Sequence, residues 1–249
     1  GSKDDSVAIA KSFEEKDQRI KVYVNLENLG DYPNRNKAAS YAKGKYLKYV
    51  DADDLIYLYG LEQLVVYMEQ FSEAGYGLCS LPQDQFQIFP FQLNPEQAYQ
   101  RHYLEQALFY KAPLSSIIKK EAFEASGQFT GKRMLGDFEM WNIMSRQFPV
   151  VLMPHGIVWS REHDEQEMAD HRKDPMFPFQ LLLLAGKLLQ NNNCPLNTSD
   201  QELALKKNKK QQATAIVSAA KNHSLQKGKE LLDASELSWL QVIRYRFIG

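Results

Sequence analysis

Hydrophobic and polar positions alternate along the first two-thirds of the chain in a way that predicts strands and helices in turn. Short apolar or β-branched runs, typical of buried strands, are separated by segments in which apolar residues recur every three or four positions. The predicted strands are Lys21–Asn25, Tyr46–Val50, Gly77–Leu81, Leu114–Ile118, Val150–Met153 and Ile157–Trp159. The predicted helices are Ser6–Lys16, Ala38–Ala42, Leu61–Phe71, Gln97–Phe109, Lys120–Ala125 and Phe138–Arg146. This order predicts an α/β fold, with a mainly parallel sheet that helices cover on both faces.

The last third of the chain has helical periodicity almost throughout. Its predicted helices are Phe179–Gln190, Asp200–Asn222 and Ala234–Ile248. Two polar segments interrupt the periodic ones: Asp31–Asn36, which contains a proline, predicts a turn-rich loop, and Asn191–Ser199 is the clearest internal boundary. We therefore expect an α/β domain over residues 1–175 and a helical C-terminal extension over residues 176–249.

Composition places the chain among ordinary folded proteins. Of its 249 residues, 44% are hydrophobic and 24% are charged, which excludes an intrinsically disordered chain. Lys and Arg number 30 against 31 Asp and Glu, so the net charge of −1 gives no reason to expect nucleic-acid binding. Cys79 and Cys194 lie far apart, which excludes a disulfide scaffold or zinc ribbon and fits a reducing compartment. With no apolar run of membrane-spanning length and no signal-peptide pattern, the sequence predicts a cytoplasmic protein.

Positive charge is concentrated in the predicted C-terminal helices. From residue 200 onward there are nine Lys and Arg and five Asp and Glu, a local charge of +4, which leaves −5 for residues 1–199. Together with aromatic residues such as Trp239, these lysines would suit peripheral contact with anionic lipid at the inner face of the plasma membrane. The other interpretation is a solvated helix face, which a run of charges more often forms.

A cluster of carboxylates follows directly after the predicted strand Tyr46–Val50. Its members are Asp51, Asp53 and Asp54. Because ligands of open α/β sheets bind beyond the carboxyl ends of strands, these side chains lie where a site is expected. Alternate carboxylates there present hard oxygen ligands to a divalent cation that also binds phosphate. On these residues alone a solvated acidic turn before a helix is the favoured interpretation, because short motifs often match by chance.

Four blocks of residues occur in order along the first two-thirds of the chain. They are Asn28–Gly30 with Arg35–Asn36, Ala42–Leu47 and Val50–Asp54; Ile117–Phe123 with Ser126–Phe129; Gly136–Trp141; and Arg161–His163. Their order and separations resemble those of family 2 glycosyltransferases, inverting enzymes of the GT-A fold, over about residues 1–168. The resemblance implies transfer of a sugar from a nucleotide-sugar donor to a hydroxyl of a glycan or lipid-linked acceptor, as in cell-surface polysaccharide assembly.

The resemblance also implies roles for individual residues. Asp51 and Asp53 would hold a Mg²⁺ or Mn²⁺ ion on the donor diphosphate, and Asp137 would be the catalytic base that deprotonates the acceptor hydroxyl. By sequence alone, Asp137 also reads as a plain helix N-cap. We interpret Trp141 and Trp159 as core residues rather than sugar-binding platforms. The further donor-binding candidates, for which the alternatives are a loop-positioning role or a surface salt bridge, are Arg35, Arg161 and His163.

Two features depart from the family pattern. Position 136 is glycine, where the family usually has glutamate. The chain opens on Gly1–Ser6, which resembles the interior of the family's first motif, so we expect the first β-α-β unit to lie upstream of this sequence. These departures keep open a non-catalytic binding or scaffold protein on a degraded version of the fold. A sugar-nucleotide nucleotidyltransferase would need a glycine- and arginine-rich N-terminal loop that we do not find.

Overall fold

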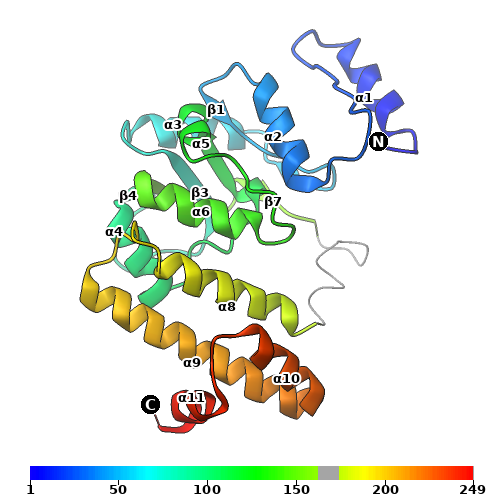
Figure 1. Ribbon diagram of the computed structural model, residues 1–249. Helices are drawn as coiled ribbons and strands as arrows, with labels where there is room; N and C mark the ends of the chain where they lie inside the picture. The colour runs from blue at the N-terminus through cyan, green and yellow to red at the C-terminus, as the bar shows by residue number, and fades with distance from the viewer. Residues whose placement is uncertain (162–173, 249) are drawn as a thin grey trace.

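The computed structural model describes residues 1–161 and 174–248 (Figure 1). Its strands are β1 Tyr46–Leu47, β2 Leu55–Ile56, β3 Tyr76–Leu81, β4 Phe91–Leu93, β5 Ser116–Lys119, β6 Val150–Pro154 and β7 Val158–Trp159. The helices in the first range are α1 Ser6–Glu14, α2 Asp31–Tyr41, α3 Gly60–Glu69, α4 Pro95–Gln100, α5 Lys120–Ala125 and α6 Gly136–Gln147. The helices in the second range are α8 Met176–Leu189, α9 Thr198–Asn222, α10 Leu225–Ala234 and α11 Trp239–Ile243. Shorter helical turns cover Arg101–Glu105, Pro113–Ser115 and Arg244–Ile248.

Five of the strands form one mixed sheet in the order β1-β5-β3-β6-β4. Within the described ranges, β3–β6 is the single parallel pair of this sheet, and β1–β5, β3–β5 and β4–β6 are antiparallel. The prediction of a mainly parallel sheet is therefore wrong. The cause is the direction in which the chain re-enters the sheet: Ser116 at the start of β5 pairs with Leu78, and Ile118 pairs with Tyr76 at the start of β3, so β5 runs back along β3. The alternation of strands and helices along a sequence does not show from which edge of the sheet the chain enters its next strand, so it does not determine the direction of that strand.

Helices cover both faces of the sheet, as the sequence predicts. Successive side chains of a strand point to opposite faces. Tyr76 of β3 faces α6, where its ring stacks on Trp141 with centroids 5.5 Å apart. Cys79 of the same strand lies on the other face and packs with Leu64 and Met68 of α3. Helices α2, α4 and α5 contribute to the core on the α6 side.

The segment Lys21–Asn25, predicted as a strand, forms no strand. A β-prone run becomes a strand only where a neighbouring strand pairs with it. Here the Tyr23 side chain stays 56% exposed, and its ring stacks on that of Tyr41 with centroids 3.8 Å apart. The segment therefore packs beside a helix instead of extending the sheet.

The segment Asp31–Asn36, predicted as a loop, is the first half of helix α2. Its proline, Pro33, lies in the first turn, where a backbone N–H has no partner within the helix, so proline is tolerated there. The predicted short helix Ala38–Ala42 is the second half of α2. This correction matters for the site, because α2 is the helix that approaches the carboxylate cluster.

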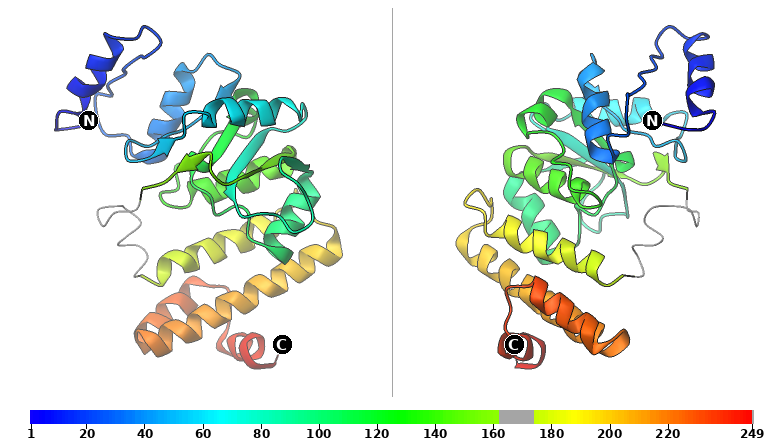
Figure 2. Two further views of the ribbon diagram at one scale, coloured as in Figure 1. Left: turned by 180° about the vertical axis from the view of Figure 1, so that it is seen from behind. Right: turned by 45° about the vertical axis from the view of Figure 1, so that its right-hand side comes forward.

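The C-terminal helices pack as a layer on the side of the molecule remote from α1 (Figure 2). Leucines 184, 188 and 189 of α8 belong to the same apolar cluster as Trp141 of α6. The predicted helix Ala234–Ile248 is interrupted, because a capping box at Ser238 starts the separate helix α11. The predicted domain boundary at residue 175 stays a prediction.

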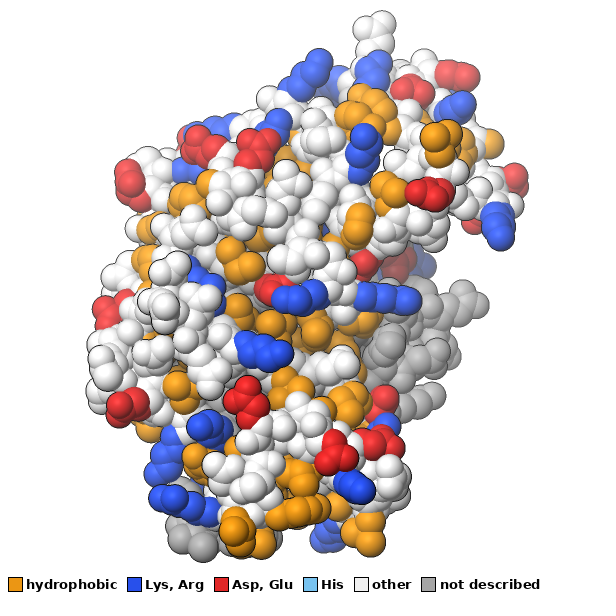
Figure 3. Space-filling view, viewed as in Figure 1, with side chains coloured by type: hydrophobic (Ala, Val, Ile, Leu, Met, Phe, Trp, Pro, Cys, Tyr) orange, Lys and Arg blue, Asp and Glu red, His pale blue; other side chains and the backbone are white. Residues whose placement is uncertain are grey.

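Charged side chains of both signs are interspersed over the face shown in Figure 3, in keeping with the net charge of −1. In the described ranges, helices are too short or too polar to cross a membrane.

Candidate active site

The loop that follows β1 carries Asp51, and an arginine of α2 holds this carboxylate. The Arg35 guanidinium donates two hydrogen bonds to Asp51, from Nη1 to Oδ1 and from Nη2 to Oδ2, both at 2.9 Å. The Tyr49 ring lies 5.7 Å from the guanidinium, and the Tyr49 hydroxyl donates to the Arg35 carbonyl at 3.2 Å. Burial by itself lowers the pKa of Arg35, but the hydrogen bonds and charge of Asp51 offset this and raise the pKa overall. The two parallel hydrogen bonds therefore hold the Asp51 carboxylate in a fixed orientation.

A two-stranded ribbon brings Arg161, one of the predicted donor-binding candidates, to the same loop. Strands β2 and β7 pair antiparallel, with Leu55 opposite Trp159. This register lets the Arg161 backbone N–H donate to Asp54 Oδ1 and its Nε donate to the Asp53 carbonyl, each at 3.1 Å. His163, the other residue predicted from this block, lies outside the described residues.

The two tryptophans near the predicted site differ in burial. Trp141 is fully buried, as predicted, and its Nε1 donates to the Lys111 carbonyl at 2.6 Å. Trp159 is 42% exposed, and the Arg161 guanidinium lies 5.6 Å from its ring. The assignment of Trp159 to the core is therefore wrong. Strand β7, which carries Trp159, pairs with the short strand β2 and leaves one side of the tryptophan exposed to solvent.

Asp137 lies in the first turn of α6, beside a buried tyrosine of α2. Its Oδ1 accepts a hydrogen bond from the Phe138 backbone N–H at 2.8 Å and one from the Tyr32 hydroxyl at 3.3 Å. The Tyr32 oxygen in turn accepts from the Asp137 backbone N–H at 3.1 Å. Burial raises the pKa of Asp137, while these hydrogen bonds and the charge of Arg35 oppose the rise. A carboxyl group with a raised pKa is a stronger base than an ordinary aspartate.

Helix α2 connects the two carboxylates. Tyr32, which contacts Asp137, and Arg35, which contacts Asp51, are three residues apart and so lie on the same side of the helix. Tyr32 is a residue that sequence reasoning missed. Its signal is the three-residue spacing to Arg35, which has no meaning when the segment is read as a loop.

The donor set suits a divalent cation that is shared with a phosphate ligand. Asp51 and Asp53 offer carboxylate oxygens, and Mg²⁺ usually binds one or two carboxylates together with phosphate oxygens and water. Within the part of the chain that the structure describes, no three His, Cys, Asp or Glu side chains gather around one metal position. Two carboxylates would therefore supply part of a coordination sphere that a diphosphate completes.

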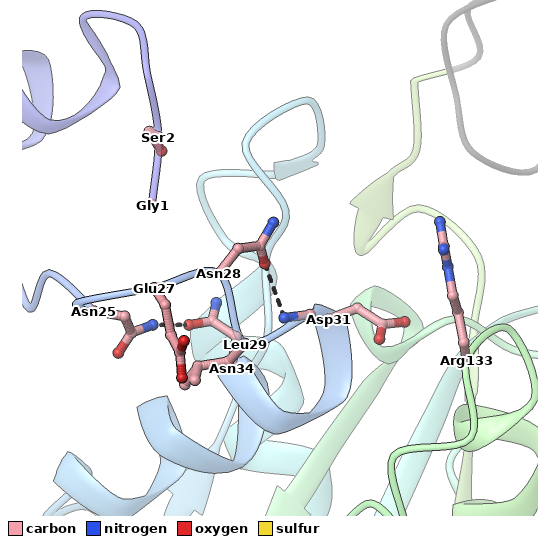
Figure 4. A pocket seen from close by; sticks show the side chains of 10 residues that line it. Gly1, Ser2, Asn25, Glu27, Asn28, Leu29, Asp31, Asn34 and Arg133 are labelled. Carbon is pink, nitrogen blue, oxygen red and sulfur yellow. Dashed lines mark hydrogen bonds between the residues drawn. The ribbon is translucent and has the colours of Figure 1, made fainter.

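A polar cavity of about 600 Å³ lies beside the N-terminal end of α2 (Figure 4). It is lined by the first two residues, Asn25, residues 27–31, Asn34 and Arg133, and Asn25 Nδ2 donates to Asn34 Oδ1 at 2.8 Å. Neither Asp51 nor Asp137 lines this cavity. We assign the candidate site from the hydrogen bonds that hold the Asp51 and Asp137 carboxylates.

The part of the chain that contains the Asp51 loop matches a known protein family. Residues 1–127, about half of the sequence, match the family described as "Glycosyl transferase family 2". The chain belongs to this family. The matched range of this family 2 chain contains Arg35, Asp51 and Asp53, whereas Asp137 and Arg161 lie beyond it. The resemblance seen in the sequence is thus confirmed.

Two relatives are uncharacterised glycosyltransferases. The one from Methanocaldococcus jannaschii is 44% identical over 61 residues, which cover 24% of this chain and 21% of the relative. The one from Haemophilus influenzae is 30% identical over 92 residues, which cover 35% of this chain and 37% of the relative. The matched segments therefore span about a fifth and somewhat over a third of these proteins.

Solved structures show that the fold is GT-A-like. Staphylococcus aureus TarS 1-349 in complex with UDP-GlcNAc superposes with a TM-score of 0.71 at 14% identity, covering 98% of this chain and 70% of TarS 1-349. The mannosyltransferase PcManGT from Pyrobaculum calidifontis, in complex with GDP-Man and Mn²⁺, superposes with a TM-score of 0.59 at 15% identity, covering 94% and 68%. At these identities the likeness concerns the fold alone.

Proposed function

We propose that this chain is an inverting, metal-dependent glycosyltransferase that moves a sugar from a nucleotide-sugar donor to a hydroxyl of a glycan or lipid-linked acceptor. The observation that carries the proposal is that one helix, α2, forms hydrogen bonds to both carboxylates, Asp51 and Asp137. Through Arg35 it fixes Asp51 at the family's donor motif, and through Tyr32 it fixes Asp137 at the position that resembles the family's base. The ligands of the two solved relatives, UDP-GlcNAc and GDP-Man with Mn²⁺, support a nucleotide-sugar donor and a divalent cation.

The proposed reaction is a single displacement at the anomeric carbon. The acceptor oxygen forms a bond to this carbon from the face opposite the leaving group, its proton passes to Asp137, and the bond to the nucleoside diphosphate breaks. Asp51 and Asp53 would hold the cation, which supplies charge neutralisation to the leaving diphosphate when it is bound. Arg35 keeps the Asp51 carboxylate oriented, and Arg161 fixes the backbone of the loop at Asp53.

Peripheral contact between the C-terminal helices and an anionic membrane surface remains part of this proposal, as does a cytoplasmic location. Trp239 and Leu240 of α11 are 51% and 80% exposed, and α11 contacts α9, which carries five lysines, so this helix pair offers both apolar and basic side chains. The acceptor pathway, cell-surface polysaccharide assembly, is likewise proposed from the family.

Replacement of Asp53 tests the donor site. We expect UDP or GDP to bind the wild-type chain in a Mn²⁺-dependent manner, and Asp53→Ala to weaken this binding by about 100-fold or more, because it removes one of two protein ligands. Isothermal titration of each nucleotide, with and without Mn²⁺, measures this. Turnover is then followed as diphosphate release from the sugar nucleotide of the preferred base, UDP-GlcNAc or GDP-mannose.

The control for this titration is Asp233→Ala, which removes an exposed aspartate of α10 far along the chain from the loop. It should bind as the wild type does. If neither this chain nor a chain extended by the upstream residues binds either nucleotide with Mn²⁺, the transferase proposal is contradicted and the non-catalytic alternative is favoured. Equal binding by Asp53→Ala would remove that residue from the proposed metal site.

Replacement of Arg35 tests the fork that holds Asp51. Arg35→Lys keeps the positive charge but cannot donate two parallel hydrogen bonds, so we expect the Kd for the nucleotide with Mn²⁺ to rise about tenfold. The matched control is Arg19→Lys, since Arg19 forms the same forked pair with Asp17 on the exposed N-terminal segment. If the two variants have the same nucleotide affinity, the Arg35–Asp51 pair has no part in binding.

A further inference from the structure

Tyr32 is buried between the two halves of the proposed site. Its side chain is 5% exposed, and its ring lies 5.0 Å from that of Phe129. The hydroxyl both donates to the Asp137 carboxylate and accepts from the Asp137 backbone N–H, so it holds this residue at two points. A single hydroxyl thus fixes both the carboxylate and the start of α6.

Gly136 makes the position of the Tyr32 ring feasible. A Cβ at residue 136 would lie 2.6 Å from Cε2 of Tyr32, a distance that no side chain tolerates without displacement of the ring. The glycine therefore leaves room for a buried phenol that hydrogen-bonds to the proposed base.

Further hydrogen bonds fix helix α2 to the segment before α6. Asn36 Nδ2 donates to the Phe129 carbonyl at 2.8 Å, and the Phe129 N–H donates to Asn36 Oδ1 at 3.1 Å. Together with the Arg35–Asp51 fork, these contacts bind one turn of α2 to the donor loop, to the segment before α6 and to Asp137. The distance between Asp51 and Asp137 is thereby set by one rigid helical turn.

We propose that Tyr32 is a positioning residue for the transfer reaction: its hydroxyl, admitted by Gly136, orients the Asp137 carboxylate toward the acceptor hydroxyl at a fixed distance from the donor carboxylates. This inference rests on the proposed function. Tyr32 acts through Asp137 and has no role in nucleotide binding.

The effect of Tyr32 on pH dependence has a definite sign. The charged and titratable groups that act on the Asp137 carboxylate come from α2, namely Tyr32 and Arg35, and Asp31 acts on Tyr32. A hydrogen bond donated by the phenol stabilises the ionised carboxylate and so lowers the pKa of Asp137, against the rise caused by burial. Burial and the charge of Asp137 raise the pKa of Tyr32, so the phenol keeps its proton and remains a donor.

The test is Tyr32→Phe, which keeps the buried ring and removes the hydroxyl. Since Asp137 must be ionised to accept a proton, we expect the acidic limb of the pH–kcat profile to move to higher pH. A shift of one pKa unit lowers kcat about tenfold at pH values well below the acidic limb and leaves kcat nearly unchanged well above it. The KM for the sugar nucleotide and the Mn²⁺-dependent nucleotide affinity should stay within about twofold of the wild type.

Tyr46→Phe is the matched control, because the Tyr46 hydroxyl also donates to a carboxylate, that of Glu69 at 2.9 Å, and Glu69 is not part of the candidate site. Its pH profile should match that of the wild type. Gly136→Ala, whose Cβ displaces the Tyr32 ring, should move the limb in the same direction as Tyr32→Phe.

An unshifted limb in Tyr32→Phe would overturn the inference, whether kcat is unchanged or falls equally at every pH, because the second pattern belongs to a purely structural residue. Failure of the proposed function has a different signature. In that case the wild-type chain itself neither binds nucleotide with Mn²⁺ nor releases diphosphate, and the inference falls with it.

Discussion

Asp137→Asn is expected to lower kcat by about 10²- to 10⁴-fold, the usual contribution of a general base. Asparagine has nearly the same shape and still accepts from the Phe138 N–H and the Tyr32 hydroxyl, but it cannot take up the proton of the acceptor hydroxyl. The Mn²⁺-dependent affinity for UDP or GDP should be unchanged, since Asp137 is not among the proposed metal ligands. Diphosphate release from the sugar nucleotide, measured beside isothermal titration, separates these two effects.

The same variant should be at least as stable as the wild type at neutral pH. Burial raises the pKa of Asp137 in the folded chain, so ionisation of this carboxyl costs more free energy in the folded state than in the unfolded state, where an aspartate has a pKa of about 3.9. Above that pH, ionisation therefore favours the unfolded state. This cost is absent below about pH 3 and grows as pH rises through the unfolded and then the folded pKa. Urea unfolding at pH 7 and pH 3 checks the sign: Asp137→Asn should gain stability at pH 7 and show no gain at pH 3.

Asp200→Asn is the control, because Asp200 also lies in the first turn of a helix, α9, and its carboxylate accepts hydrogen bonds from the Asn197 and Gln100 side chains. It should retain full activity. A kcat for Asp137→Asn within threefold of the wild type would show that Asp137 is an N-terminal helix residue and not the base.

Much of the fold was predictable from local pattern, and what failed depended on contacts between distant segments. The helix Lys120–Ala125 has the predicted bounds, and the strands at Gly77–Leu81 and Val150–Met153 are correct to within one residue, because each is a short buried run with polar or glycine-containing flanks. The direction of the strands was not predictable, since it depends on where the chain returns to the sheet. The run Lys21–Asn25 has the same composition as a strand but no strand to pair with.

The places of the candidate site residues were predictable where they belong to a motif and unpredictable where they depend on packing, and their roles stay predictions. The order of the motifs predicts that Asp51, Asp53 and Arg161 belong together, and the ribbon of β2 and β7 brings Arg161 to the loop. The contact of Tyr32 with Asp137 joins residues 105 positions apart, and it requires both a helix at residues 31–41 and a glycine at position 136. Neither condition is visible in one sequence whose proline suggests a loop.

The position of Asp137 also depends on what anchors α6, and here Trp141 is expected to have the largest effect on stability. Trp141 follows Asp137 by one helical turn, is fully buried, stacks on Tyr76 of the central strand and donates from Nε1 to the Lys111 carbonyl. Trp141→Ala removes these contacts and leaves a cavity, which costs about 3–5 kcal/mol for a buried tryptophan. Since small domains have a free energy of unfolding of about 5–15 kcal/mol, the variant should be close to unfolding at 25 °C.

Urea unfolding of Trp141→Ala and of Trp239→Ala distinguishes this anchor from an exposed tryptophan. Trp239 is 51% exposed at the start of α11, so its removal should change the free energy of unfolding by no more than about 0.5 kcal/mol. A loss below about 1 kcal/mol in Trp141→Ala would mean that α6 is held by other contacts. In Trp141→Phe, which keeps a ring against Tyr76, nucleotide affinity should survive while kcat falls. The donor loop depends on α2, whereas the base depends on the start of α6.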